Sequence, residues 1–339
     1  MWGVKLSTTE PFVYSIFGLQ SPSDQPTVQQ EALRAQFDSL ITPHATHIDR
    51  LLQNGCTTAQ QPTGKTVIWL GYWATRTQYL NWWTSSAVQT FWTTLPATDA
   101  GMWREILTPD ASRTQYGTNE PDPHRTGLGH LGPRMSIADK SGYWGCYRQR
   151  MAASTGDRFT TPIKRDLVPQ RPSLDTNKAD APVPDGIRRQ PGRVHLTQFP
   201  DNICFVVEGQ DHSRISEAEK AYWFEHFDQS VNTWMADLVL TPGPDTGMLD
   251  SRLCFAPESG RFRTGSTALP ALDYHKKVQL FYFKDLRHME RVGRSNKGHA
   301  ALRSRFMAAY GPDGEMSAGS IGLWVETTVL KGHEMEYER

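Results

Sequence analysis

The hydrophobic positions along the first half of the chain alternate between strand-like and helix-like spacing. The aromatic and β-branched run at 12–17 predicts a strand. Residues 28–55 predict one helix that Pro43 interrupts, because apolar side chains recur there every three or four positions. The apolar run at 66–74 predicts a buried strand, and the segment 76–95 predicts a helix rich in aromatic residues.

The second half repeats this order of elements. Strand, helix, strand, strand, helix, strand is the order of a ferredoxin-like unit, so the repetition predicts an α+β fold of two related halves. The first helix of this half opens with an S-x-x-E capping box at Ser216 and Glu219. The elements that the pattern predicts here are a strand at 202–210, a helix at 216–240, strands at 248–256 and 277–285, a long helix at about 285–310 and a strand at 321–330.

Composition places a connecting segment between the two halves. Residues 162–191 carry six prolines and few apolar side chains, which is typical of a surface excursion. We therefore divide the chain into an N-terminal ferredoxin-like half at 1–153, a Pro-rich connecting loop at 154–195 and a C-terminal ferredoxin-like half at 196–339.

The charge balance excludes partners that are selected by bulk charge. Lys and Arg number 36 and Asp and Glu number 36, whereas nucleic-acid binders and membrane-surface proteins need a basic excess or a basic face. Neither a secretion signal nor an apolar run of about 18 residues is visible, and the four cysteines form no CxxC pair. We expect a cytoplasmic protein. Its 11 tryptophans supply large rings that can wall a flat ligand.

Common catalytic motifs are missing, but one histidine is a candidate ligand. The sequence has no Walker loop, GxGxxG, HExxH or GxSxG motif. His299 begins a resumed helix after Asn296, and Leu302, Phe306 and Tyr310 follow it at helical spacing. An imidazole on such an apolar face is either a hydrogen-bonded core residue or an axial ligand to haem iron.

Two further features carry charge where the pattern is apolar or glycine-rich. In GYWGCYRQRM, at 142–151, the glycines predict a strand or bend close to something flat, with Arg148 and Arg150 on one side at period two. A surface pair of arginines on an edge strand is the alternative. Glu208 shares a strand face with Cys204 and Val206, so its carboxyl is either partnered by an arginine or kept protonated.

At these places the sequence resembles the haem-containing aldoxime dehydratases, and its fungal branch above all. The resemblance rests on GYWG followed by R-x-R, on EGQDH after a strand that begins NIC, and on SNKGH opening the tract GHAALRSRFMAAYGPDGEM. It implies two ferredoxin-like halves in a dimeric α+β barrel-like unit with a haem pocket. It also implies a haem b whose ferrous iron binds the aldoxime nitrogen, a lyase reaction that gives a nitrile, His299 as the iron ligand and Arg150 as the distal arginine.

The sequence departs from the family pattern on the distal side. Glu208 stands where the bacterial enzymes have a serine, and Val325 stands where they have a distal histidine. The stretch QYGTN around Tyr116 lacks the carboxylate that partners that histidine. Our hypothesis is that Glu208 has taken over the acid role, because a carboxyl in an apolar pocket has a raised pKa. His130 is the second candidate for a proton relay.

Two other functions stay open at this point. One is a related haem enzyme that acts on another N–O or N–N substrate, and the other is a haem-binding or sensing protein without turnover. Retention of Arg150 and of an ionisable group at Glu208 favours an enzyme. The expected partner is a small-molecule aldoxime, with neither nucleic acid nor membrane, and homodimerisation is left open.

Overall fold

The computed structural model describes residues 1–21, 23, 25–54, 64–96, 100–120, 123–139, 147–163, 192–239 and 246–339. Over these residues the strands form a single sheet that is built by antiparallel pairing. Its order across the sheet is β7 (Arg134–Ser136), β1 (Trp2–Val4), β6 (Thr114–Thr118), β12 (Gly322–Leu330), β9 (Ile203–Asp211), β11 (Lys276–Phe283), β10 (Met248–Phe255), β3 (His47–Asn54), β4 (Lys65–Trp73), β2 (Val13–Ser21), β5 (Met102–Leu107), β13 (Met335–Glu338) and β8 (His195–Leu196).

Two four-stranded units with the same connectivity make up the middle of this sheet. In the first, the chain order β2, β3, β4, β5 gives the spatial order β3-β4-β2-β5, and in the second the chain order β9, β10, β11, β12 gives β12-β9-β11-β10. Both are the ferredoxin-like arrangement, so the predicted α+β class is confirmed. The helices between these strands are α1 (Val28–Ile41), α2 (Arg76–Trp83) and α3 (Ser86–Thr93) in the first unit and α5 (Glu217–His226), α6 (Asp228–Val239), α7 (Leu286–Ser295) and α8 (Lys297–Tyr310) in the second.

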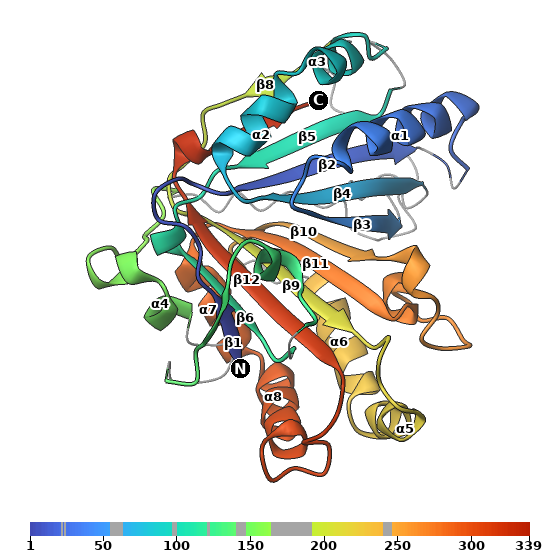
Figure 1. Cartoon of the computed structure of the whole chain (residues 1–339). Helices are drawn as coiled ribbons and strands as arrows, with labels where there is room; N and C mark the ends of the chain where they lie inside the picture. Colours follow the sequence, from blue (N-terminus) through green and yellow to red (C-terminus); the bar gives the residue numbers. More distant parts are fainter. Residues whose placement is uncertain are drawn as a thin grey trace, which may run out of the picture.

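The two units share an interior, and their helices lie on the outside. Figure 1 shows α1, α2 and α3 over the outer face of the first unit and α6, α7 and α8 over the outer face of the second. The inner faces pack together in one cluster that holds Ile16 and Leu70 of the first unit and Phe205 and Leu280 of the second. Because strand side chains alternate in direction, every second residue of β9 faces outward, toward the helices.

Strands from each half also extend the sheet of the other. β6 pairs with β12 at one end, and β13 pairs with β5 at the other. The two units are therefore interlocked through their outer strands. The division of the sequence at 153 and 196 stays a prediction.

The prediction of one helix over 28–55 is wrong in its second part. A capping box at Thr27 and Gln30 opens α1, which ends at Ile41, and after a turn at 42–46 the chain continues as β3 from His47 to Asn54. β3 pairs with β4 along its whole length, and Asp49, Leu51 and Gln53 are buried at period two. Short apolar runs fit both spacings, and here the neighbouring strand decided the outcome.

The three remaining long helices are each interrupted. The segment 76–95 forms α2 and α3, the segment 216–240 forms α5 and α6, and the segment 285–310 forms α7 and α8 with Asn296 between them. Ser216 caps α5 as predicted, but the Glu219 side chain accepts hydrogen bonds from the backbone at Ser320 and Ile321 instead of closing the capping box. Among the residues that the structure describes, no helix has the length and apolar character needed to cross a membrane.

Candidate active site

A large cavity lies between the outer face of the second unit and its helices. It encloses about 1280 Å³ of space between atoms, the open mouth included. One wall is the sheet, through β9, β11 and β12, and the other consists of α6, α7 and α8. The lining residues that matter below are Glu208, Gln279, Phe281 and Val325 on the sheet wall and Trp234, Glu290, Gly293, Arg294, His299 and Arg303 on the helix wall.

Three side chains stand in a row across the sheet wall. Val325 of β12 is the register partner of Glu208 of β9, and Glu208 is in turn the partner of Gln279 of β11. Directly opposed residues in antiparallel strands have Cβ atoms about 5 Å apart, so the three side chains are neighbours. Glu208 is thus flanked by an apolar group on one side and by an amide on the other.

The Glu208 carboxyl is the ionisable group of this row. Burial raises its pKa to about 7, and no charge or hydrogen bond from the described residues offsets that effect. The group therefore holds a proton over part of the neutral range, and it faces the cavity. The prediction that Glu208 shares a strand face with Cys204 and Val206 is confirmed. Both of these residues pack in the hydrophobic cluster on the helix side of the sheet.

His299 projects from the helix wall into the same cavity. The Asn296 side chain caps α8 by accepting a hydrogen bond from the His299 backbone N–H at 2.9 Å, which fixes the first turn. The ring Nδ1 lies 2.8 Å from the Gly293 carbonyl oxygen. A carbonyl only accepts hydrogen bonds, so Nδ1 carries the proton and the neutral ring keeps a lone pair on Nε2. Burial is the largest effect on the His299 pKa and lowers it, which favours that neutral form.

A tryptophan packs against one face of the imidazole ring. Trp234 of α6 stacks on the His299 ring at a centroid distance of 4.4 Å and an interplanar angle of 26°. The carbonyl bond and the stacking together set the plane of the imidazole. This arrangement, with one nitrogen hydrogen-bonded to a carbonyl and the other available, is the usual one for a histidine that ligates a metal.

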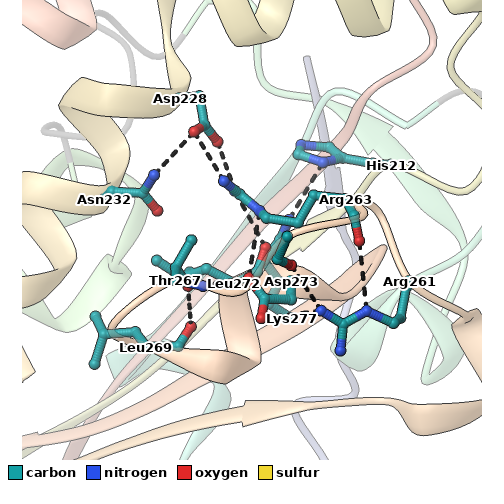
Figure 2. Close-up of polar contacts among 11 residues, drawn as sticks. His212, Asp228, Asn232, Arg261, Arg263, Thr267, Leu269, Leu272, Asp273 and Lys277 are labelled. Atoms are coloured by element: carbon teal, nitrogen blue, oxygen red, sulfur yellow. Dashed lines mark hydrogen bonds and ion pairs between the residues drawn. The ribbon is translucent and has the colours of Figure 1, made fainter.

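A bidentate ion pair fastens α6, which carries Trp234, to the loop before β11. Figure 2 shows the Arg263 guanidinium meeting the Asp228 carboxylate, with both nitrogen–oxygen pairs in reach at 2.6 and 2.9 Å. Asp273 accepts from Arg261 on the other side of the loop. Bidentate arginine–carboxylate pairs fix orientation as well as distance, so they brace this end of the cavity wall.

A buried lysine lies beside that brace. Lys277 of β11 is two residues before Gln279 on the same sheet face, and its amine is 3.2 Å from Nδ1 of His212 (Figure 2). Burial lowers the pKa of Lys277 to about 7. Polar side chains on this face of β11 thus extend from Gln279 in the cavity wall to the buried contact between Lys277 and His212.

Arg150 lies next to the cavity and is not among its lining residues. It ends α4 (Tyr147–Arg150), whose first residue lines the cavity, and its Nη1 donates to the Gln115 amide oxygen at 3.3 Å. Gln115 in turn donates to Thr327, which is two residues beyond Val325 on β12. Arg150 therefore reaches the sheet wall at its β6 edge.

The prediction that Arg148 and Arg150 share one side of a strand is wrong. α4 is helical, and residues two apart on a helix diverge by about 200°. Arg148 instead pairs with the cavity residue Glu290 at 2.9 Å. The glycines and aromatic residues of the preceding motif, at 142–146, lie outside the described residues.

His130, the second candidate for a proton relay, is placed elsewhere. Its ring stacks on His47 of β3 at 3.7 Å, outside the cavity lining. Burial lowers its pKa to about 4. A ring at that position does not reach the cavity that contains Glu208 and His299.

The chain matches the family model of the haem-containing dehydratases over residues 15–338. It belongs to that family. The protein is therefore a lyase that carries a haem. A comparison with curated protein sequences finds no match.

Two solved structures support the fold of this haem dehydratase. An aldoxime dehydratase in complex with butyraldoxime superposes with a TM-score of 0.72 at 19% identity, over 99% of this chain and 85% of that one. A second aldoxime dehydratase also gives 0.72, at 18% identity, over 99% of this chain and 87% of that one. At these identities the likeness establishes the shared fold.

The cavity of this family member fits a haem. His299 offers an imidazole nitrogen from the helix wall, and the lining holds no second histidine among the described residues. No cluster of three His, Cys, Asp or Glu side chains exists in the described parts of the chain. A metal held by one protein ligand is what a haem provides, because the porphyrin supplies four nitrogen ligands itself.

Sequence reasoning missed three residues of this site. Gln279 stands in the otherwise apolar run VQLFYF, a signal that was available. Trp234 was one of many aromatic residues on amphipathic helices, and nothing in the sequence singled it out. The Gly293 carbonyl acts through backbone geometry, which leaves no trace in residue identity.

Proposed function

We propose that this haem dehydratase converts aldoximes to nitriles in the cavity between β9 and α8. The observation that carries the proposal is the placement of His299 and Glu208 on opposite walls of one cavity. In the reaction R–CH=N–OH loses a carbon-bound proton and its hydroxyl, so that R–C≡N and water form with no net oxidation. The mostly apolar lining suits an alkyl or aryl R group.

We assign the iron ligand to His299 and the acid to Glu208. A ferrous haem held by His299 would supply an iron that can bind the substrate nitrogen and lend electron density to the N–O bond. Glu208, whose pKa is about 7, delivers a proton to the departing hydroxyl oxygen. The carboxylate that remains then removes the proton from the substrate carbon, which returns Glu208 to its starting form.

Arg150 has a positioning role in this proposal. It contacts Gln115 at the β6 edge of the sheet wall, from where a guanidinium can orient the substrate hydroxyl. Val325, in register with Glu208, leaves the position of a distal histidine apolar, and this keeps the carboxyl protonated. We also propose a cytoplasmic location, which the buried free thiols of Cys204 and Cys254 support.

The test is nitrile formation by the haem-loaded, dithionite-reduced protein with butyraldoxime, measured by gas chromatography. The proposal predicts that each aldoxime consumed yields one nitrile and that each haem supports many turnovers. Glu208→Gln should lower the rate by about 10²- to 10⁴-fold at unchanged haem content. A wild-type protein that holds haem and yields no nitrile from alkyl or aryl aldoximes would refute the function, and unchanged turnover in Glu208→Gln would refute the role of the carboxyl.

A further inference from the structure

Gln279 is the member of the cavity row that the reaction above does not use. It lies on β11 in register with Glu208 and lines the cavity. Its amide oxygen is buried and has no hydrogen-bond partner among the described residues. Gln115, an amide on the same face of the sheet, has a partner in the Thr327 hydroxyl. A buried acceptor left without a donor destabilises the fold, so its presence in the wall of a binding cavity points to a donor on the ligand.

We propose that the Gln279 amide oxygen accepts the hydrogen bond of the substrate N–O–H group and so determines specificity for a free hydroxyl. The proposal rests on the proposed function, since it assigns a contact within the same reaction. Glu208, on the neighbouring strand, approaches the same oxygen as a proton donor. With its own proton directed to Gln279, the hydroxyl oxygen turns a lone pair toward the Glu208 proton.

This arrangement accounts for every proton of the departing water. The hydroxyl keeps the proton that it shares with Gln279, and it gains the second from Glu208 as the N–O bond breaks. Gln279 itself neither gains nor loses a proton. It is therefore a binding residue for which an amide suffices, whereas the neighbouring position needs an acid.

Val325, on the other side of Glu208, strengthens the assignment to Gln279. It occupies the equivalent neighbouring position on β12 and offers no polar atom. Gln210 also lines the cavity, two residues further along β9 and out of the row, in register with Lys277 and Leu323. Gln279 is therefore the amide that stands beside Glu208 within the described lining.

A ligand pair that differs only in the hydroxyl proton tests the inference. Butyraldoxime and its O-methyl ether are titrated against ferrous haem-loaded protein by rapid mixing, and affinity is read from the absorption change before product forms. A site that is built to accept a hydroxyl proton discriminates against the ether. In Gln279→Leu the affinity for butyraldoxime should fall about tenfold and the affinity for the ether should stay the same.

The leucine variant has nearly the volume of the wild-type side chain and removes an unpaired polar group, so it should fold and bind haem normally. Gln210→Leu is the matched control and should keep the wild-type ratio of the two affinities. An unchanged ratio in Gln279→Leu overturns the inference, as does an equal loss of discrimination in both variants or a loss of haem in Gln279→Leu alone.

The nitrile assay separates this inference from the proposed function. If the wild type forms nitrile and Gln279→Leu keeps its discrimination, the assignment of Gln279 fails and the function stands. If the wild type forms no nitrile while Gln279→Leu selectively loses affinity for the free oxime, the hydroxyl contact is supported and dehydration is refuted.

Discussion

At the residue scale, the site depends on two groups whose surroundings select one protonation state. His299 keeps its Nε2 lone pair because the Gly293 carbonyl holds the proton on Nδ1, and burial opposes protonation of the ring. Glu208 keeps its proton near neutral pH because burial raises the pKa of its carboxyl to about 7 and no charged group among the described residues offsets that effect. His299, with a free lone pair on Nε2, and Glu208, with a carboxyl proton, thus lie on opposite walls of the cavity.

The pKa of Glu208 predicts the pH dependence of the reaction. A general acid must be protonated, so kcat/KM should be constant below pH 7 and fall about tenfold per pH unit above it, because the free-enzyme pKa is about 7. In Glu208→Gln the residual rate should lack that descending limb. Glu290→Gln is the control, since Glu290 also lines the cavity but is paired with Arg148, and it should keep the limb. A limb that persists in Glu208→Gln would assign the titration to another group.

How much of the site the sequence could predict differs from residue to residue. His299 and Glu208 could be found because each breaks an apolar pattern on its own element. Gln279 does so as well, but its significance depends on register with Glu208 across β9 and β11, which only the folded sheet supplies. The direction of Arg150 was missed because a one-turn helix stands where glycine spacing indicated a strand.

At the element scale, the break between α7 and α8 positions His299, the residue that we propose as iron ligand. Asn296 leaves the helical path with extended backbone and caps α8, so that His299 falls in the first turn of the new helix. Its imidazole then reaches back to Gly293 near the end of α7. The sequence indicated the cap through Asn296. The strand β3 was instead predicted as helix, because its conformation depends on pairing with β4, which the local sequence does not show.

Loss of this cap should loosen the ligand. Asn296→Ala is expected to lower the free energy of unfolding by about 1 kcal/mol and to speed haem release to apomyoglobin, because the first turn that carries His299 frays. Asn296→Asp keeps an accepting oxygen and should behave like the wild type. Wild-type haem release from Asn296→Ala would show that α8 is fixed by packing alone.

At the scale of the whole molecule, a buried carboxyl ties the two units together. Glu326 of β12 accepts hydrogen bonds from the hydroxyls of Tyr14 and Tyr72 in the first unit, at 2.9 and 3.2 Å. Glu326 follows Val325 directly, so it points away from the cavity and into the shared interior. Burial is the largest effect on its pKa and raises it to about 8. The repeated unit was visible in the sequence, but this contact between the units was not.

The raised pKa of Glu326 makes stability depend on pH. Between about pH 5 and 8 the unfolded chain releases this proton and the folded protein keeps it, so the free energy of unfolding falls as pH rises, by up to about 1.4 kcal/mol per unit. Glu326→Gln should remove that slope and gain stability relative to the wild type toward pH 8. The free energy of unfolding is measured by denaturant titration at several pH values across this range. As the control, substitution of the exposed Glu315 in Glu315→Gln should give the same pH dependence as the wild type. Parallel curves for Glu326→Gln would mean that the carboxyl is ionised in the folded protein.

The central claim is that His299 binds the iron of a haem held between α8 and β9, and an absorption spectrum tests it directly. Haem-loaded wild type should show a sharp Soret band typical of a single histidine ligand. His299→Gly should lose that band and recover it when free imidazole, which fits the vacated space, is added. A His299→Gly protein that keeps the wild-type spectrum without imidazole would contradict the assignment of this cavity as the haem site.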